Sequence, residues 1–301
     1  MSEQQPVKIP EDGNPPGDQT STRARQQQSP RQREWLNRLS LTQMTTKNWS
    51  FAQDVSSIKS LGLNHIGLWR WKCDDLTEEE LIAQLQKSQI TPSSLSWLGG
   101  FTGVNGYLVD DAVEEAAEQI QLAHHRGIKT LVACTGEQGP HIQTHATRLA
   151  ADALRELGDA ALPLDLQIAV MPMSSVTSHG WTFLTSIRKC REFLDQCNHP
   201  QVGACLNTFH LMQERNWKTE LKSLIPDLKL VRLCDAGSPR RATVQQLPFS
   251  GQLKLTALVE YLESQGYRGM YEIDTWSDEV WQLMGLAPFR RSIQSFVEII
   301  G

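Results

Sequence analysis

The chain has 301 residues, of which 40% are hydrophobic and 21% are charged, with a formal net charge of -5 and an isoelectric point near 5.9. This much apolar material is enough for a substantial core, and the length suits one α/β barrel with a tail. The acidic balance argues against strong non-specific binding to nucleic acid, and no apolar run approaches the ~20 residues that span a bilayer. Because the N-terminus also lacks a secretory pattern, we expect a cytoplasmic protein without a membrane partner.

The N-terminal segment differs in composition from the rest of the chain. Residues 1–34 are rich in Gln, Pro, Ser, Arg and Gly and have almost no large apolar side chains. Such a segment buries too little apolar surface to offset the entropy that ordering costs. We therefore predict a disordered tail over residues 1–34 and a folded domain over residues 35–301. A loose arginine cluster between residues 23 and 38 is interpreted as a solvated charge run, to which we assign no function.

From Leu39 onward, short apolar or β-branched runs alternate with amphipathic helical stretches. This alternation is typical of βα units around a parallel sheet. Residues 110–125 show the helical pattern clearly, because apolar side chains recur every three to four positions and Gly127 follows as a stop signal. Eight strands are predicted, at residues 39–44, 65–68, 94–97, 130–134, 166–170, 202–206, 228–233 and 270–273.

Glycines stand between a predicted helix and the next predicted strand at Gly62, Gly127 and Gly266. A left-handed cap is needed at such places, and glycine adopts it without steric cost. Eight βα units of this kind predict a closed (β/α)8 TIM barrel. A doubly wound sheet would use fewer strands and a GxGxxG turn after the first, where this chain has residues 45–49 without a glycine.

The six cysteines show no CxxC spacing, and three of them lie inside apolar strand-like runs. This distribution favours reduced core thiols over a disulfide framework or a zinc knuckle.

In a (β/α)8 barrel the reactive groups lie at the C-terminal ends of the strands. Tryptophans there suit stacking on the apolar face of a sugar ring, while Arg, Asn, His and carboxylates suit its hydroxyls or a phosphate. An alternative of equal weight is that each tryptophan only covers the barrel mouth. The candidates at these positions are Trp69, Arg70, Trp71, Trp97, Glu137, Met171, Asn207, His210, Arg232, Asp235, Glu272, Asp274 and Trp276.

Residues 202–210, 230–236 and 266–272, together with the order of the eight units, resemble the xylose isomerase-like TIM barrels. This superfamily of sugar phosphate isomerases and epimerases also includes inosose dehydratases and endonuclease IV. The resemblance covers nearly everything after the tail and implies the superfamily rather than one activity. The chain does not present the three-metal cluster of the endonuclease IV branch, so we expect no DNA-repair function.

The resemblance also implies four positions that hold a divalent metal, at the ends of strands five, six, seven and eight. In this chain they fall on Met171, Asn207, Arg232 and Glu272, where the resemblance implies Glu, Asp, His and Glu. A sulfur, an amide and a guanidinium replace two anions and one imidazole and add a fixed positive charge. We therefore expect no metal ligands and no cofactor, and hypothesise that Arg232 takes the electrostatic role of the cation.

A metal-independent isomerase, epimerase or lyase is the leading hypothesis for the function. Its substrate would be a polyhydroxylated small molecule, such as a sugar, a sugar phosphate or a hydroxy-carbonyl compound. Glu272 or Glu137 would be the proton-transfer base, His210 an acid or orienting group, and Arg232 the stabiliser of an enolate oxygen. The expected substrate-binding residues are Asn207, Asp235, Arg241, Trp69, Trp97 and Trp276.

Two alternatives remain open. The barrel could be a catalytically inactive protein that binds a metabolite or acts in assembly or regulation. Arg232, Glu272 and Asp235 could equally form a structural ion-pair network, His210 could bond a backbone carbonyl, and Glu137 could cap a helix. The sequence assigns no oligomeric state.

Overall fold

The computed structural model describes residues 29–73, 76–104, 106, 108–212, 214–238 and 242–300. The predicted disordered tail lies outside the described residues as far as residue 28. The folded part begins earlier than predicted, because Pro30–Leu36 form helix α2 with Ser29 as its N-cap. Trp35 and Leu36 at the end of this helix are buried and anchor it to the core. The prediction missed the helix because it used the average composition of the segment, which is polar.

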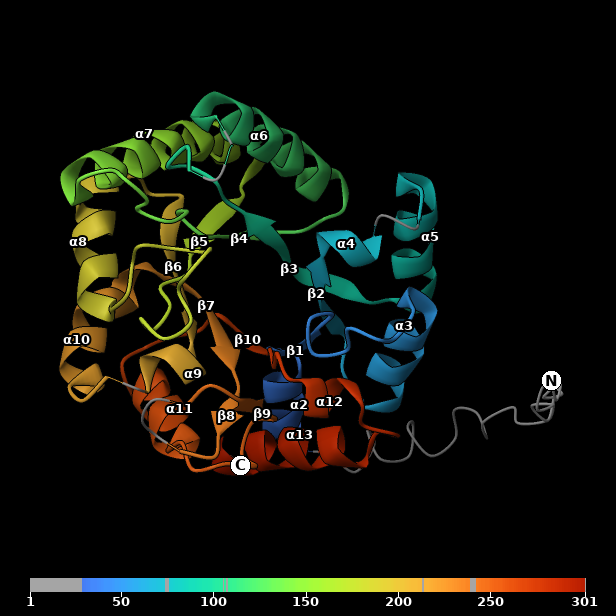
Figure 1. The fold of residues 1–301 in the computed structure, drawn as a ribbon. Helices are drawn as coiled ribbons and strands as arrows, with labels where there is room; N and C mark the ends of the chain where they lie inside the picture. Colours follow the sequence, from blue (N-terminus) through green and yellow to red (C-terminus); the bar gives the residue numbers. More distant parts are fainter. Residues whose placement is uncertain are drawn as a thin grey trace, which may run out of the picture.

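Eight parallel strands close into a barrel in the order β1-β10-β7-β6-β5-β4-β3-β2 (Figure 1). This arrangement confirms the predicted (β/α)8 fold and its eight strands. The strands are β1 Leu39–Thr42, β2 His65–Trp69, β3 Thr91–Leu98, β4 Thr130–Ala133, β5 Gln167–Val170, β6 Val202–Asn207, β7 Leu228–Leu233 and β10 Met270–Ile273.

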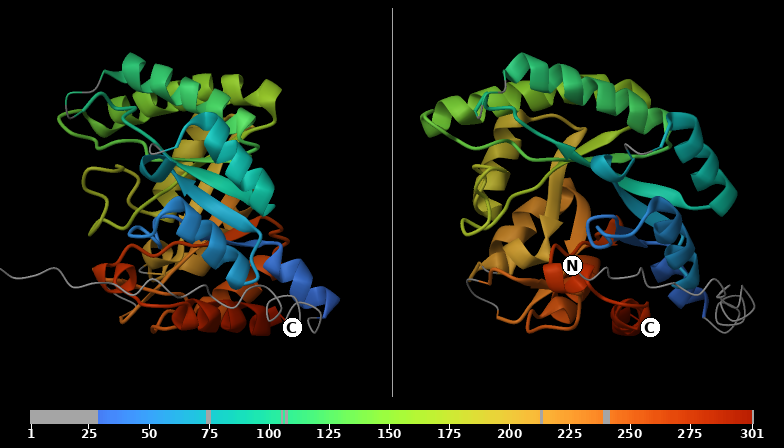
Figure 2. Two further views of the ribbon diagram at one scale, coloured as in Figure 1. Left: turned by 90° about the vertical axis from the view of Figure 1, so that its right-hand side faces the viewer. Right: turned by 45° about the vertical axis from the view of Figure 1, so that its right-hand side comes forward.

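Helices surround the barrel, as the views in Figures 1 and 2 show from three directions. In the described part of the chain, no helix is both long and apolar enough to cross a membrane. The longer helices are α3 Phe51–Ser60, α5 Glu78–Ser88, α6 Val109–His125, α7 Gln143–Ala161, α8 Ile187–Cys197, α10 Trp217–Leu224, α11 Leu255–Ser264 and α13 Ala287–Ile300. Shorter elements are α4 Arg70–Cys73, α9 Thr208–Leu211, α12 Asp278–Trp281, η1 Leu162–Leu164 and η2 Ile225–Asp227, with a hairpin of β8 Asp235–Ala236 and β9 Gln245–Gln246.

Local signals account for several of these boundaries. Gly62, Gly127 and Gly266 have φ values of 79°, 69° and 90°, so the predicted left-handed positions after three helices are confirmed. Strand β3 begins at Thr91, three residues before the predicted start. The prediction stopped short because proline is unusual inside a strand, but Pro92 pairs with Ile66.

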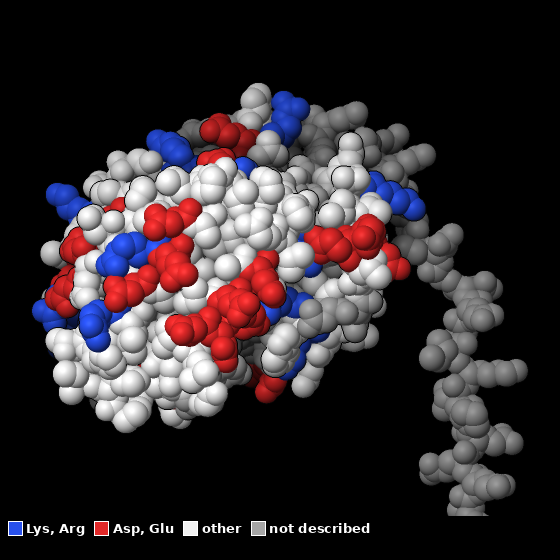
Figure 3. Space-filling view, turned by 90° about the horizontal axis from the view of Figure 1, so that it is seen from above, with Lys and Arg blue, Asp and Glu red and all other residues white. Residues whose placement is uncertain are grey.

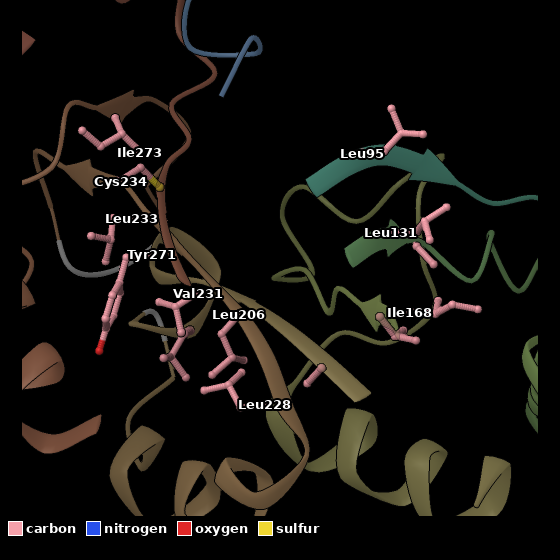
Figure 4. Close-up of a cluster of buried hydrophobic side chains, with 14 of the residues drawn as sticks. Leu95, Leu131, Ile168, Leu206, Leu228, Val231, Leu233, Cys234, Tyr271 and Ile273 are labelled. Carbon is pink, nitrogen blue, oxygen red and sulfur yellow. The ribbon is translucent and has the colours of Figure 1, made fainter. Parts of the chain in front are cut away.

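The apolar core has two layers on opposite faces of the strands. The outer layer lies between strands and helices, and Figure 4 shows Leu131 and Ile168 as part of it. The inner layer lies within the barrel, where Val132, Ala169 and Met171 belong to a separate cluster. Neighbouring residues such as Leu131 and Val132 fall in different layers because successive side chains of a strand point to opposite faces.

The cysteines belong to this core. All six are buried and none is disulfide-bonded, which confirms the prediction of reduced core thiols. Burial raises the pKa of Cys134 and of Cys190 to about 12, so both stay protonated at neutral pH.

The charged surface is patchy on the side that carries α6 and α7. Figure 3 shows acidic and basic side chains next to one another in small clusters on this face, with uncharged side chains between the clusters. Such an arrangement gives this side no extended field of one sign.

Candidate functional site

A charged network occupies the barrel interior near the C-terminal ends of β7 and β10. Arg232 and Glu272 are register neighbours on these strands, and the Arg232 Nε donates to the Glu272 Oε2 at 3.0 Å. The other carboxylate oxygen of Glu272 accepts hydrogen bonds from Ser93 at 2.5 Å and Ser94 at 2.7 Å. Both charged side chains are 1% exposed or less. Glu272 is therefore held as a sealed carboxylate with three donors, an arrangement that favours an internal ion pair over a solvent-facing base.

A glycine makes room for this carboxylate. A Cβ at Gly67 of β2 would lie 2.8 Å from a methyl group of Thr42 and 3.0 Å from the Glu272 Oε1. The close approach excludes larger residues at position 67 unless the network shifts.

Asp274 lies two residues after Glu272, on the same face of the chain, and extends the network. Its Oδ2 lies 3.7 Å from the Arg232 Nη1 and accepts from the Asn207 Nδ2 at 3.3 Å. Its Oδ1 accepts from Thr42 at 2.8 Å and from the Trp276 Nε1 at 3.3 Å. The carboxylate thus connects the arginine with a tryptophan at the barrel mouth.

Asn207 uses both ends of its amide. The nitrogen donates to Asp274, while the oxygen accepts from the Phe209 backbone at 3.0 Å and from the Cys234 Sγ at 3.1 Å. An aspartate at position 207 would keep the two acceptor contacts but would place a second carboxylate against Asp274 without a donor. The amide therefore fits this network better than the acid implied by the family resemblance.

Tryptophans separate the network from the barrel mouth. The Arg232 Cζ lies 4.8 Å from the Trp97 ring centroid, within the range of a cation–π contact. Trp97, Trp181 and Trp276 form a cluster with centroid distances of 5.6, 5.4 and 5.4 Å. Trp97 therefore covers the guanidinium on the side that faces the loops.

A cavity of about 280 Å³ lies at the mouth beyond this cluster, and we call it the mouth pocket. Its charged side chains already have partners: the Arg70 Nη2 lies 2.5 Å from the Glu115 Oε1, and Glu137 contacts His179. The Gly180 N–H donates to the Glu137 Oε1 at 2.6 Å. The lining residues are Arg70, Trp97, Leu98, Gly99, Gly100, Thr102, Val104, Glu115, Cys134, Gly136, Glu137, Gly180 and Trp181.

Two buried polar atoms of the pocket lining have no hydrogen-bond partner: the Trp97 Nε1 and the Thr102 Oγ1. Buried polar groups are satisfied in most proteins, so atoms of this kind mark places where a water or a ligand completes the site. A Cβ at Gly136 would lie 2.6 Å from the Thr102 Oγ1, so the approach of these two loops requires glycine there, which has a φ of 91°.

The predicted site residues divide into several groups. Asn207, Arg232 and Glu272 come together in the sealed interior network, and Asp274 joins them. Trp97 and Trp276 belong to the mouth cluster, and Glu137 lines the mouth pocket.

The remaining predicted substrate-binding residues lie elsewhere. Trp69 packs on Trp71 with a centroid distance of 5.1 Å and does not line the mouth pocket. Asp235 accepts the backbone N–H groups of Ala236 and Leu253, both at 2.8 Å, and so anchors the segment after β7. Arg241 lies outside the described residues.

The surroundings of His210 favour the orienting group over the acid, the two roles that the sequence predicted. The side chain is buried, and its Nδ1 lies 3.2 Å from the Thr177 Oγ1, not from a backbone carbonyl. Burial lowers the pKa of His210 to about 3, so the ring is neutral at physiological pH and carries no second proton to donate. An orienting role stays a prediction.

Sequence reasoning missed the serines that hold Glu272 and Arg232. Ser93 and Ser94 donate to Glu272, while the Ser96 Oγ accepts from the Arg232 Nη2 at 2.6 Å. The signal was present as two serines in the predicted strand 94–97 and a third directly before it, since hydroxyls inside a barrel need partners there.

The four positions implied by the resemblance do not fit a divalent metal. Met171 packs in the inner apolar cluster, Asn207 is committed to the hydrogen bonds described above, and Arg232 already neutralises Glu272. Within the described ranges, no group of three or more His, Cys, Asp and Glu side chains is placed to hold a metal ion. The four positions supply one carboxylate, one amide oxygen, one thioether and one guanidinium, and so lack the further anionic oxygens and the imidazole that such a cation prefers.

Comparisons with known proteins place this geometry in context. A family model described as "Xylose isomerase-like TIM barrel" matches residues 55–298. No protein of curated function matches the sequence significantly.

Solved structures share the fold at low sequence identity. The SMc04130 protein from Sinorhizobium meliloti 1021 and the IolI protein, solved with a bound zinc atom, are each 17% identical, with TM-scores of 0.76. The alignments cover 88% of this chain and 97% of the former, and 87% and 98% for IolI. D-psicose 3-epimerase from Clostridium cellulolyticum H10, solved with D-tagatose, is 11% identical over 87% of this chain and 97% of its own, with a TM-score of 0.70. At these identities the likeness concerns the fold alone.

Proposed function

Because this chain belongs to the xylose isomerase-like TIM barrel family, we propose that it binds a neutral polyhydroxylated small molecule in the mouth pocket without a divalent metal. The observation that carries this proposal is the pair of unsatisfied atoms, the Trp97 Nε1 and the Thr102 Oγ1, in a pocket bounded by Trp97 and Trp181. A sugar offers an apolar ring face for the indoles together with hydroxyls for the polar groups of the lining. A neutral ligand is favoured because Arg70 already contacts Glu115, and the other lining carboxylate, Glu137, would repel an anion.

The binding function is favoured over chemistry at the interior network. Glu272 is 0% exposed, accepts three hydrogen bonds and lies behind Trp97 and Arg232. A general base must come within hydrogen-bond reach of the proton that it removes. The network satisfies this condition only if the tryptophan cluster opens.

A metal-independent isomerase or epimerase is the second candidate, and the position of Glu137 favours it. This carboxylate lines the mouth pocket and is oriented by the Gly180 N–H. Glu115 also lines the pocket but contacts Arg70, so Glu137 is the better placed of the two carboxylates to exchange a proton with a ligand there.

Calorimetric titration with D-tagatose and D-psicose tests the binding function. We expect Trp97→Ala to weaken binding by roughly 3- to 10-fold, in line with the value of an aromatic contact. Thr102→Val, which keeps the shape and removes the hydroxyl, should weaken it by roughly 5-fold. Trp217→Phe is the matched control, because Trp217 packs on Tyr261 and does not line the mouth pocket.

Two results would contradict the binding function. One is the absence of heat for wild type with either sugar up to the solubility limit. The other is a Trp97→Ala variant that binds as tightly as Trp217→Phe.

Incubation with the same sugars in D2O separates the two candidates. If wild type incorporates deuterium into the sugar and Glu137→Gln does not, the enzyme candidate replaces the binding protein. Binding without deuterium incorporation in wild type supports the binding protein.

Metal independence is tested by restoring the ligand types. Elemental analysis of wild type purified without chelator should find no stoichiometric Mn, Mg, Zn or Co. The triple variant Met171→Glu, Asn207→Asp, Arg232→His should gain Mn²⁺ affinity, because it supplies oxygen and imidazole ligands around Glu272. Stoichiometric metal in wild type would overturn metal independence, and a folded triple variant that binds no Mn²⁺ would contradict the assignment of the four positions.

A further inference from the structure

We infer that Arg232 is a positioning residue for Trp97. It fixes the orientation of the indole, which forms part of the wall of the mouth pocket. The guanidinium therefore acts on a ligand only through the indole. The inference deepens the proposed function and rests on it for the ligand, but the geometry of the Arg232–Trp97 pair stands by itself. Arg232 does not line the mouth pocket, whereas Trp97 does.

Contacts on three of its nitrogens fix the orientation of the Arg232 guanidinium. Its Nε is bonded to Glu272 at 3.0 Å, its Nη2 to Ser96 at 2.6 Å, and its Nη1 lies 3.7 Å from the Asp274 Oδ2. The guanidinium is planar and always charged, so these contacts determine the orientation of its face as well as its position.

The face of the Arg232 guanidinium lies against the indole of Trp97. The Arg232 Cζ lies 4.8 Å from the indole centroid. The Nη2 also donates a hydrogen bond to the Oγ of Ser96, the residue directly before Trp97 in the chain. The arginine therefore holds both the ring and the strand residue next to it, and a buried cation under an indole is a stronger contact than an exposed one.

The same network also orients the indole of Trp276. Asp274 accepts from the Trp276 Nε1 at 3.3 Å, and Trp276 lies 5.4 Å from Trp97. Arg232 and Asp274 thus secure two neighbouring members of the tryptophan cluster from below. Trp97 lines the pocket, and its Nε1 is buried without a hydrogen-bond partner.

The alternative is that Arg232 contacts the ligand directly. Its Nη1 is buried without a hydrogen-bond partner, as expected for a donor that awaits an acceptor. Trp97 lies over the guanidinium, however, and the described lining of the mouth pocket does not include the arginine. The two possibilities predict different couplings between positions 232 and 97.

The geometric part is tested by 19F NMR of protein labelled with 5-fluorotryptophan, without any ligand. The chain has nine tryptophans, and the Trp97 resonance is assigned from its loss in Trp97→Phe. We expect Arg232→Met combined with Glu272→Gln to displace the Trp97 resonance by more than its linewidth. This double variant removes the Arg232–Glu272 pair as a unit, while Asp274 keeps its hydrogen bonds from Thr42, Asn207 and Trp276.

Arg232→Lys keeps the charge without a planar face and should displace the resonance by a smaller amount. The matched control is Lys129→Met, which removes an exposed ion pair with Asp165 and should leave the Trp97 resonance unmoved. An unmoved Trp97 resonance in the double variant would overturn the inference. If the double variant does not fold, an unmoved resonance in folded Arg232→Lys would overturn it equally.

The ligand part uses D-tagatose titrations of Arg232→Lys, Trp97→Ala and the variant that combines them. We expect Arg232→Lys to weaken binding by roughly 3- to 10-fold, which is the value of the aromatic contact that it disturbs. In the Trp97→Ala background the same change should have no further effect, because the arginine acts through the indole. Losses that add in the combined variant would show direct contact and overturn the inference.

Failure of the inference and failure of the proposed function remain distinguishable. If wild type binds neither sugar, the proposed function fails while the 19F measurement still decides whether Arg232 positions Trp97. If wild type binds and the Trp97 resonance does not respond to position 232, the function stands and the inference fails.

Discussion

The barrel interior and the barrel mouth contain the same types of ion pair in opposite surroundings. Arg232 and Glu272 in the interior are 1% and 0% exposed, whereas Arg70 and Glu115 at the mouth are 29% and 53% exposed. Burial makes the interior pair costly to separate, while solvent makes the mouth pair easy to exchange for other partners. The comparison teaches that the interior residues form a sealed ion-pair network, whereas under the proposed function the ligand contacts lie in the loops at the mouth.

The strongest way to break this comparison is to remove one interior charge. Arg232→Met should lower the free energy of unfolding by about 3–5 kcal/mol, because it leaves Glu272 and Asp274 buried without their cation. Urea denaturation measures the change. The control, Lys129→Met, removes a pair with exposures of 61% and 90% and should cost less than about 1 kcal/mol. Equal losses in the two variants would show that the interior pair is not special.

The next largest effect concerns pH. Burial lowers the pKa of His210 to about 3, whereas an unfolded histidine titrates near 6.5. Below pH 6.5 the unfolded state binds a proton that the folded state excludes, so stability is full above this pH and is lost as the pH falls toward 3. Between pH 6.5 and pH 5 the loss from this group is about 2 kcal/mol, at ~1.4 kcal/mol per pH unit.

His210→Gln should remove this part of the pH dependence in urea denaturation at pH 7.5, 6 and 5. His125→Gln is the control, since His125 is exposed on α6. If the slopes of wild type and His210→Gln agree, His210 is not buried in its neutral form.

The smallest expected effect lies at the mouth. Glu137→Gln should cost about 1 kcal/mol of stability or less, because its side chain is 18% exposed and the change weakens the hydrogen bond from the Gly180 N–H. Glu272→Gln, measured beside it, should cost more, since it leaves the buried Arg232 with less compensating charge. The comparison fails if the two glutamines destabilise the protein equally.

The fold was predictable to the extent that local patterns specify it. Apolar alternation located all eight barrel strands, and three glycines located helix ends. The errors have local causes as well. Helix α2 was missed because two anchors, Trp35 and Leu36, follow a polar segment, and the start of β3 was missed because of Pro92.

The candidate site was less predictable. Strand ends identified Arg232, Glu272 and Trp97 as individual residues, but not their relation to one another. Nothing in the local pattern distinguishes a glutamate that faces a ligand from one enclosed by Ser93 and Ser94. Thr102 was not singled out either, because its unsatisfied hydroxyl arises where the loop after β3 meets Gly136 after β4.

The sequence by itself determined the eight βα units and the residue types at the four family metal positions, since periodicity and side-chain chemistry are local properties. Only the tertiary structure decided that Arg232 lies between Glu272 and Trp97, and that the pocket is lined by the end of β3, by α6 and by the segments that follow β2, β3, β4 and β5. The physical reason is that closure of the barrel sets which strand ends face one another, and hence which charges are sealed from water and which remain accessible.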